Sequence, residues 1–264
     1  MKGNGRIILF IFIILLAVVI VALNFTLLTV KEINVLADVN SSLIDEDFIL
    51  TSSGIEYNKN ILFLDEEKAS SSIESANPYI QVISIERRFP WSLDIKVTLR
   101  SPLISIPTKD GNFAVLDHNL KILEVCDGEK DLLTDLIPLS GILVDDPTSG
   151  SVLNMTNSVN ASLGEILAVL MSETKDTQSA LSIIDSIEVR EKGDFFIKTT
   201  AGVIFCVFAS NGASDQALCA FRLYASFSDA DVRRQEGYIY FNPQSTVAPD
   251  VGAVEWSETP PIVG

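Results

Sequence analysis

Three patterns of apolar and polar residues follow one another along this chain of 264 residues. Residues 7–23 are uninterrupted apolar, and mostly apolar residues continue to Val30. Short alternating and helix-like patterns fill residues 29–100, and a longer set of such segments extends to residue 242. These patterns predict an α+β protein with an apolar N-terminal helix, two folded units and a polar C-terminal tail.

The first apolar run is long enough for a transmembrane helix, because about 20 residues at 1.5 Å each cross a hydrocarbon core of about 30 Å. Lys2 and Arg6 precede the run, which places the N-terminus in the cytoplasm. The length of the run favours an uncleaved anchor over a signal peptide. We predict a cytoplasmic tail at residues 1–6 and a single-pass type II signal anchor at residues 7–28, bounded by Ile7 and Leu28.

The next unit, residues 29–100, begins with strand and helix signals. We expect a strand at residues 30–36 and an extended piece at residues 60–64. Two helices are expected around that piece. The first starts among Ser41, Ser42 and Asp45 and ends at Gly54, and the second is capped by Asp65 and ends at Asn77-Pro78.

The clearest strand signal closes this unit. Leu93, Ile95, Val97 and Leu99 alternate with polar residues, as in a strand with one buried and one solvated face. A strand at residues 80–88 and a turn at residues 89–92 precede it. The predicted order is therefore β-α-α-β-β.

This order behind one apolar run resembles the POTRA domain of the FtsQ/DivIB family of bacterial cell-division proteins. The matching stretches are residues 30–35, 54–55, 60–65, 78–80 and 87–90, then Leu93-x-Ile95-x-Val97 and Arg100-x-Pro102. The chain departs from the family at Leu99, where an acidic residue is usual, and at Asp117-His118-Asn119, which replaces an Asp-x-x-Gly turn. The resemblance implies a POTRA domain over residues 29–100.

Residues 101–242 predict a mixed-sheet β domain with two helices, which also resembles the second domain of that family. Strands are expected at residues 104–106, 113–116, 122–125, 183–189, 195–199, 203–208 and 238–241, and helices near residues 163–171 and 215–225. Residues 127–156 are rich in turn-forming residues and predict a loop around residues 136–141. Residues 243–264 predict a flexible tail, with residues 254–256 as a short strand.

Charge and composition exclude several functions. Nineteen basic residues against 35 acidic ones give a net charge of −16, which argues against binding nucleic acid. One His and three Cys leave few ligands for zinc, and we expect no metal, cofactor or small-molecule substrate. Three buried thiols are favoured, although a bond between Cys206 and Cys219 stays open.

Catalysis has one candidate motif, Ser172-x-x-Lys175, which fits the acylating motif of penicillin-binding proteins. No Ser-Asp-Asn motif completes it, so a chance match is favoured. The acidic run Asp45-Glu46-Asp47 lacks the glycine and distal glutamate of a calcium loop, and a helix start explains it better.

Binding is better supported than catalysis, and it has two candidate surfaces. The last strong strand, with Tyr238, Ile239, Tyr240 and Phe241, is expected at a sheet edge to which a partner strand could be added. The second surface comprises Arg87, Arg88 and Trp91 beside Pro90. It could hold a carboxylate, although a plain turn between two strands is favoured.

The family resemblance implies a non-enzymatic scaffold at the division septum. Its partners would be single-pass division proteins of the FtsB/DivIC and FtsL type, and in addition septal peptidoglycan synthases. The alternatives are an extracytoplasmic enzyme that uses Ser172 and Lys175, and a POTRA-containing secretion or assembly component. The latter would be expected to repeat its POTRA unit, and the sequence shows no repeat.

Overall fold

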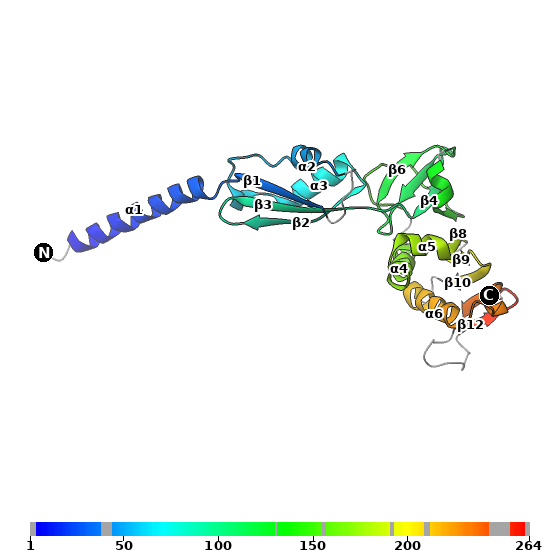
Figure 1. Cartoon of the computed structure of the whole chain (residues 1–264). Coiled ribbons are helices and arrows are strands. Elements are labelled where there is room, and N and C mark those ends of the chain that lie inside the picture. The colour runs from blue at the N-terminus through cyan, green and yellow to red at the C-terminus, as the bar shows by residue number, and fades with distance from the viewer. Residues whose placement is uncertain are drawn as a thin grey trace. The chain divides into compact units, whose positions relative to one another are not determined.

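The computed structural model describes residues 4–37, 44–129, 131–154, 157–190, 193–208, 212–242 and 254–261. The chain divides into two compact units, Met1–Arg100 and Ser101–Gly264, each of which is described by itself. Figure 1 shows the helices and strands of both units in chain order.

The apolar N-terminal run forms helix α1, Asn4–Leu27. The large apolar side chains between Leu9 and Val19 are 46–66% exposed. Within the described residues, no helix has both the length and the apolar character needed to cross a membrane. The anchor predicted at residues 7–28 therefore stays a prediction.

The rest of the first unit is a three-stranded sheet with helices, and its order β-α-α-β-β is as predicted. Strand β3 lies at the centre, with β1 parallel to it on one side and β2 antiparallel on the other. The elements are β1 (Glu32–Ala37), α2 (Glu46–Ser53), the 3-10 helix η1 (Ile61–Phe63), α3 (Glu66–Ala76), β2 (Ile80–Arg88) and β3 (Ser92–Leu99).

Helix caps fix where these helices begin and end. The Asp45 side chain accepts a hydrogen bond from the Asp47 N–H at 2.9 Å, and Asp65 does the same for Lys68 at 3.0 Å. Gly54 ends α2 with φ +65°. These caps confirm the prediction at the positions described, while Ser41 and Ser42 lie outside the described residues.

The piece at residues 60–64 is not extended as predicted, because its centre is the 3-10 helix η1. The Asn60 side chain accepts from the Leu62 N–H at 2.9 Å and so favours a turn over a strand. Ile61 is fully buried at this turn.

The alternation predicted for β3 is confirmed on its buried face, where Leu93, Ile95 and Val97 enter the core. On the opposite face Asp94 differs from expectation, since it is only 9% exposed. Its carboxylate accepts from Asn34 at 3.1 Å and from Arg88 at 2.8 Å. Neighbouring strands therefore cover Asp94 while its hydrogen bonds compensate for lost water.

The second unit contains a nine-stranded mixed sheet in the order β12-β11-β10-β9-β8-β7-β4-β5-β6. Its strands are β4 (Ile104–Pro107), β5 (Phe113–Leu116), β6 (Ile122–Cys126), β7 (Ile137–Ser140), β8 (Ile184–Val189), β9 (Phe195–Thr199), β10 (Val203–Val207), β11 (Gly237–Phe241) and β12 (Val254–Ser257). The 3-10 helices are η2 (Asp131–Asp135) and η5 (Val232–Arg234).

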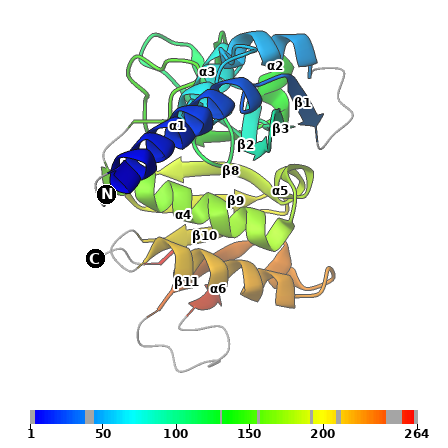
Figure 2. The same ribbon diagram turned by 90° about the vertical axis from the view of Figure 1, so that its left-hand side faces the viewer.

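Helices α4 (Asn157–Thr174) and α6 (Ala213–Ser226) lie side by side along the sheet, as Figure 2 shows. Their apolar faces belong to the same core cluster as the buried strand residues. Both helices were predicted. A third helix, α5 (Thr177–Ile183), was not predicted, although Asp176 caps it by accepting from the Ser179 N–H at 2.7 Å.

The prediction that residues 127–156 form a loop is wrong for the centre of this segment, where strand β7 lies. This strand is parallel to β4 on one side and to β8 on the other, so it joins the two halves of the sheet. Ile137 and Leu139 are buried, while the residues after them, Pro138 and Ser140, are exposed. That period-2 pattern is the strand signal, and the surrounding turn residues obscured it.

The tail boundary also differs from the prediction. Strand β12 pairs antiparallel with β11, so the folded unit continues to Ser257 rather than ending at residue 242. The short strand predicted at residues 254–256 is confirmed. The part of the predicted tail at residues 243–253 lies outside the described residues.

Candidate functional site

Strand β11 is an interior strand, and the prediction that it forms the edge of the sheet is wrong. It pairs with β10 on one side, where Cys206 lies opposite Tyr240, and with β12 on the other, where Glu255 lies opposite Tyr240. In the described structure β12 is the terminal strand of the sheet at this end. The candidate docking edge therefore moves outward by one strand.

The four residues predicted on β11 divide between the two faces of the sheet. Ile239 is fully buried in the core, and Phe241 packs against the same core. Tyr238 and Tyr240 point to the opposite face and are half-buried. Of the predicted set, the two tyrosines are thus the side chains that a partner could contact directly.

Tyr240 belongs to a row of cross-strand neighbours on this face, in which it lies between Cys206 and Glu255. The row runs through Glu188, Phe196, Cys206, Tyr240 and Glu255. The Tyr240 hydroxyl donates to Glu255 at 2.9 Å. Burial, together with that carboxylate, raises the pKa of the Tyr240 phenol.

The two ends of this row carry charge. At one end the Asn242 amide donates to Glu255 at 2.8 Å. At the other end the Arg190 guanidinium lies 3.8 Å from the centre of the Phe196 ring and pairs with Glu188 at 3.0 Å. The face therefore presents the half-buried Tyr240 and the buried Phe196 between ionised groups, and aromatic side chains of this kind are enriched at protein interfaces.

Strand β12 is fixed to its neighbour by close packing at Gly237. This glycine has φ +111°, and a Cβ there would lie 2.5 Å from Nε1 of Trp256. The same Nε1 donates to the Glu236 carbonyl at 3.0 Å. Trp256 thus closes over the start of β11 and holds β12 in register.

The outer side of β12 has no strand paired to it among the described residues. A strand in that position presents backbone N–H and C=O groups to which an extended segment of another protein can bind. Sequence reasoning missed Glu255 and Trp256 as part of this site. The available signal was the apolar, polar, apolar order of Val254, Glu255 and Trp256.

The second predicted surface is already neutralised within the first unit. Arg87 donates to the Leu64 carbonyl at 2.9 Å and pairs with Glu66 at 3.1 Å. Arg88 pairs with Asp94 at 2.8 Å and with Glu86, and the Asp94 contact raises its pKa. Both arginines thus form ion pairs with carboxylates of the same unit. This supports the favoured interpretation, in which residues 87–91 form a structural turn rather than a binding surface.

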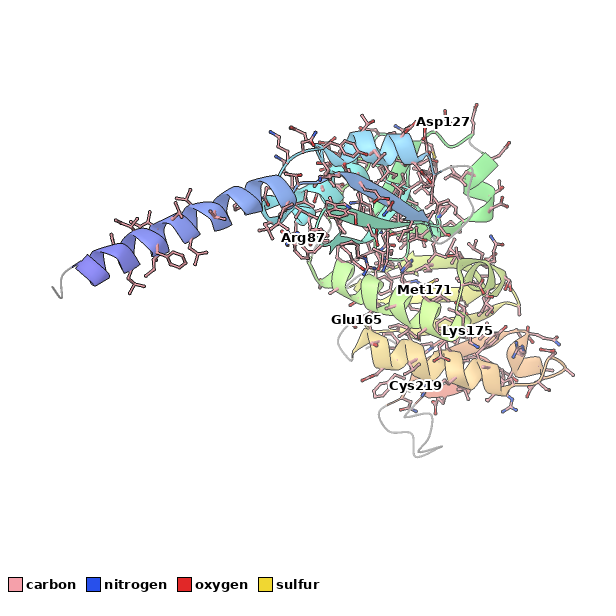
Figure 3. All side chains as sticks on the ribbon, turned by 60° about the vertical axis from the view of Figure 1, so that its left-hand side comes forward. Arg87, Asp127, Glu165, Met171, Lys175 and Cys219 are labelled. Carbon is pink, nitrogen blue, oxygen red and sulfur yellow. The ribbon has the colours of Figure 1, made fainter. Side chains whose placement is uncertain are left out.

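The candidate catalytic pair is not assembled. The Ser172 hydroxyl donates to the Val169 carbonyl of its own helix at 2.8 Å. Lys175 lies directly after the end of α4 (Figure 3). Its φ is +71°. Among the described residues no hydrogen bond joins Ser172 to Lys175, and no cluster of three His, Cys, Asp or Glu side chains could hold a metal.

No disulfide joins Cys206 to Cys219, and both are free thiols. Cys206 is buried, and burial raises its pKa to about 12. Cys126 and Cys219 are partly exposed, so the prediction of three buried thiols is wrong for these two.

Comparison with known proteins identifies the first unit. The sequence of residues 28–100 matches the family described as "POTRA domain, FtsQ-type". Residues 28–100 are an FtsQ-type POTRA domain. The resemblance to the FtsQ/DivIB family is thereby confirmed, and it rests on the stretch whose β-α-α-β-β order the structure shows.

Two curated relatives extend the similarity beyond the POTRA domain. The "Cell division protein DivIB" of Clostridium acetobutylicum is 26% identical over 61% of this chain and 62% of its own length. The protein of the same name from Clostridium botulinum is 30% identical over 56% of this chain and 54% of its own length. The matches thus span less than two thirds of these relatives.

Proposed function

We propose that the protein is a non-enzymatic, membrane-anchored scaffold of the bacterial division machinery. The observation that carries the proposal is the FtsQ-type POTRA domain at residues 28–100, in a chain that is similar to proteins named DivIB. Its role would be to hold other single-pass division proteins at the septum and so help to regulate septal peptidoglycan synthesis.

In this proposal, residues 7–28 are the anchor, residues 1–6 lie in the cytoplasm and the two folded units lie outside. The sequence supports this topology through the apolar run of residues 7–23 and through Lys2 and Arg6 before it. The large apolar side chains exposed between Leu9 and Val19 also fit lipid better than water.

Strand β12 is the proposed docking edge, with Tyr238 and Tyr240 on the adjoining face. An added partner strand would gain main-chain hydrogen bonds along β12, and the tyrosines would supply contact area. Partners of the FtsB/DivIC and FtsL type suit this site because they are themselves single-pass proteins of the same membrane.

The location of the protein in growing source cells tests the scaffold proposal. A functional fusion tagged at the N-terminus is expected to form a band at midcell that follows constriction. The matched control lacks residues 101–264 and keeps the anchor and POTRA domain. An even distribution of the intact fusion around the cell periphery would contradict the proposal.

The absence of catalysis is tested on the purified full chain. We expect no hydrolysis or transpeptidation of peptidoglycan, because Ser172 donates within its own helix rather than to a base. Turnover that disappears in Ser172→Ala but not in the neighbouring Ser179→Ala variant would contradict the non-enzymatic assignment.

A further inference from the structure

Exposed apolar side chains gather at one end of the POTRA domain. Seven large apolar side chains of described residues 28–100 are exposed: Leu36, Tyr57, Leu62, Phe63, Ile83, Phe89 and Trp91. Five of these seven belong to residues 57–63 and 89–91. A solvated domain surface does not normally concentrate such residues in one place.

The first of these segments is bound directly to the start of the domain. The Ile61 N–H donates to the Leu28 carbonyl at 2.8 Å, and the Val30 N–H donates to the Lys59 carbonyl at 2.9 Å. The Asn58 N–H donates to the Val30 carbonyl at 2.8 Å. Residues 57–63 therefore lie beside the residues that immediately follow α1.

The second segment reaches the same place from the other side. The Lys31 N–H donates to the Trp91 carbonyl at 2.8 Å, and the Lys31 ammonium lies 5.4 Å from the centre of the Trp91 ring. The parallel register of β1 and β3 places Glu32 opposite Ser92. The turn at residues 89–91 thus lies at the end where the chain enters the sheet.

We propose that this end, the anchor-proximal rim formed by Tyr57, Leu62, Phe63, Phe89 and Trp91, inserts into the lipid–water interface of the membrane that holds the anchor. The inference rests on the proposed anchor at residues 7–28. The rim would then be a second membrane contact, which sets the height and the orientation of the POTRA domain.

The length of chain between anchor and rim supports lipid as the occupant. Residues 28–31 span at most about 14 Å when fully extended, and Ile61 is hydrogen-bonded to Leu28 itself. The polar interfacial layer on each side of a bilayer is about 5–8 Å thick. A helix that leaves the hydrocarbon core at Leu28 therefore carries the rim into this layer.

The chemistry of the rim also fits that layer. Tyr57 is 51% exposed and Trp91 is 43% exposed, and these two aromatic residue types, whose rings carry a polar group, are enriched at membrane interfaces. Phe63, which is 79% exposed, adds apolar surface beside them. Lys31 and Lys59 can extend their charges toward water. Lys59 pairs with Glu56 at 3.3 Å and Glu32 adjoins Lys31, so the charges balance and insertion is expected to be insensitive to salt.

Tryptophan fluorescence tests the proposal, because Trp91 and Trp256 are the only tryptophans. The full-length Trp256→Phe variant is reconstituted into vesicles of phosphatidylglycerol and phosphatidylethanolamine. Nitroxide-labelled lipids then quench from a shallow or a deep position. We expect strong quenching of Trp91 by the shallow label, and loss of most of it when Leu62 and Phe63 are both replaced by serine.

Two reporters in the chain lacking Trp91 and Trp256 separate the rim from the anchor. Leu36→Trp is the matched control, because Leu36 is also exposed but lies away from the rim. It is four residues further along β1 than Glu32, which corresponds to about 13 Å. It should show little quenching. Leu16→Trp reports the anchor and should be quenched by the deep label.

The outcomes are distinct. Deep quenching at residue 16 without shallow quenching at Trp91 overturns the rim inference but not the proposed anchor. The exposed side chains of the rim would then be expected to contact a protein partner. No deep quenching at residue 16 contradicts the proposed anchor. Equal quenching at residues 36 and 91 overturns the rim inference, because the domain would then lie flat on the membrane.

Discussion

Glu74 on α3 joins three parts of the POTRA domain through one carboxylate. One oxygen accepts from the Val82 N–H of β2 at 3.1 Å, and the other accepts from Arg100 at 3.1 Å. The Arg100 side chain is only 7% exposed. The contact therefore satisfies a backbone donor beside a bulge in an edge strand and also balances a buried charge.

Replacing Glu74 with alanine is expected to destabilise the POTRA domain by about 2–3 kcal/mol, because a buried guanidinium loses this carboxylate. Hydrogen exchange at the Val82 amide of the full chain measures the effect, which should be faster exchange. Glu74→Gln should lose less stability than Glu74→Ala, since the glutamine carbonyl oxygen can still accept a hydrogen bond from the Val82 N–H. Glu67→Ala, an exposed position on the same helix, is the control. Equal exchange in the Glu74→Ala and Glu67→Ala variants would contradict this assignment.

The buried thiol of Cys206 predicts a pH dependence. Its pKa in the folded state is about 12 against an ordinary value of 9.0. Between these values the unfolded chain loses the thiol proton while the folded chain keeps it. The unfolded state is thereby favoured, and stability falls as pH rises, by up to about 1.4 kcal/mol per pH unit.

Urea unfolding of the second unit, followed through Trp256, tests this expectation. The difference in free energy of unfolding between the wild type and Cys206→Ala should change as the pH rises above 9.0, in favour of the variant. Cys219→Ala is the comparison at a partly exposed thiol. A difference between wild type and Cys206→Ala that stays constant with pH would refute the predicted ionisation.

Single residues were predictable from sequence where their role is local. Asp45, Asp65 and Gly54 act on backbone groups within a few residues, so their caps could be recognised from the chain order. Asp94 was placed on a solvated face because its partner Asn34 lies on a strand 60 residues earlier. That contact depends on the parallel pairing of β1 with β3, which no local pattern encodes.

At the level of elements, β7 was missed, and β12 was predicted only as a short strand within a flexible tail rather than as part of the sheet. Both strands lie inside segments rich in turn residues. β7 contains four residues followed by Gly141, whose Cβ would lie 1.8 Å from the Val189 carbonyl oxygen. β12 also contains four residues. Each is stabilised by neighbouring strands rather than by its own propensity, so sequence alone left the docking edge one strand too far inward.

The docking edge can be tested with proline, because in an antiparallel pair successive residues face the partner strand and the outside in turn. Of Glu255 and Trp256, one N–H therefore points toward β11 and the other toward the outer edge. Proline at the outward position should preserve β12 and weaken the binding of a partner of the DivIC type about fivefold, since one main-chain hydrogen bond contributes about 1 kcal/mol.

Alanine at the same two positions is the matched control, because each side chain also bonds within the sheet. The proline variants are compared with the alanine variants by partner affinity and by hydrogen exchange of β11. Proline at Ile239 or Tyr240 would be less informative, since β11 is an interior strand and its ladder would break. Proline and alanine variants with equal affinity at both positions would rule out docking through this edge.

For the whole molecule, the sequence predicted the order of the segments along the chain but not which surfaces contact other molecules. The apolar run, the POTRA signals and the later strands occur in separate segments, so their succession could be predicted. The POTRA assignment is confirmed by the match over residues 28–100. The partners depend on surfaces built from distant strands, such as the row from Glu188 to Glu255, and remain a prediction.

The proposed scaffold places recognition in the folded units and only attachment in the anchor. The apolar run contains no Gly-x-x-x-Gly motif, which would allow close packing against another helix. The glycines nearest to the run, Gly3 and Gly5, precede it. Replacing residues 7–28 with an unrelated single-pass anchor of equal length and orientation should therefore preserve the midcell band.

The measurement is the fraction of cells with a septal band, at matched expression. The control keeps the native anchor and replaces Gly237 with alanine, whose Cβ would displace Trp256 and with it β12. We expect the exchanged anchor to retain the band and Gly237→Ala to lose most of it. The reverse result would place recognition in the anchor rather than in the C-terminal strands, and the docking edge would then have no role at the septum.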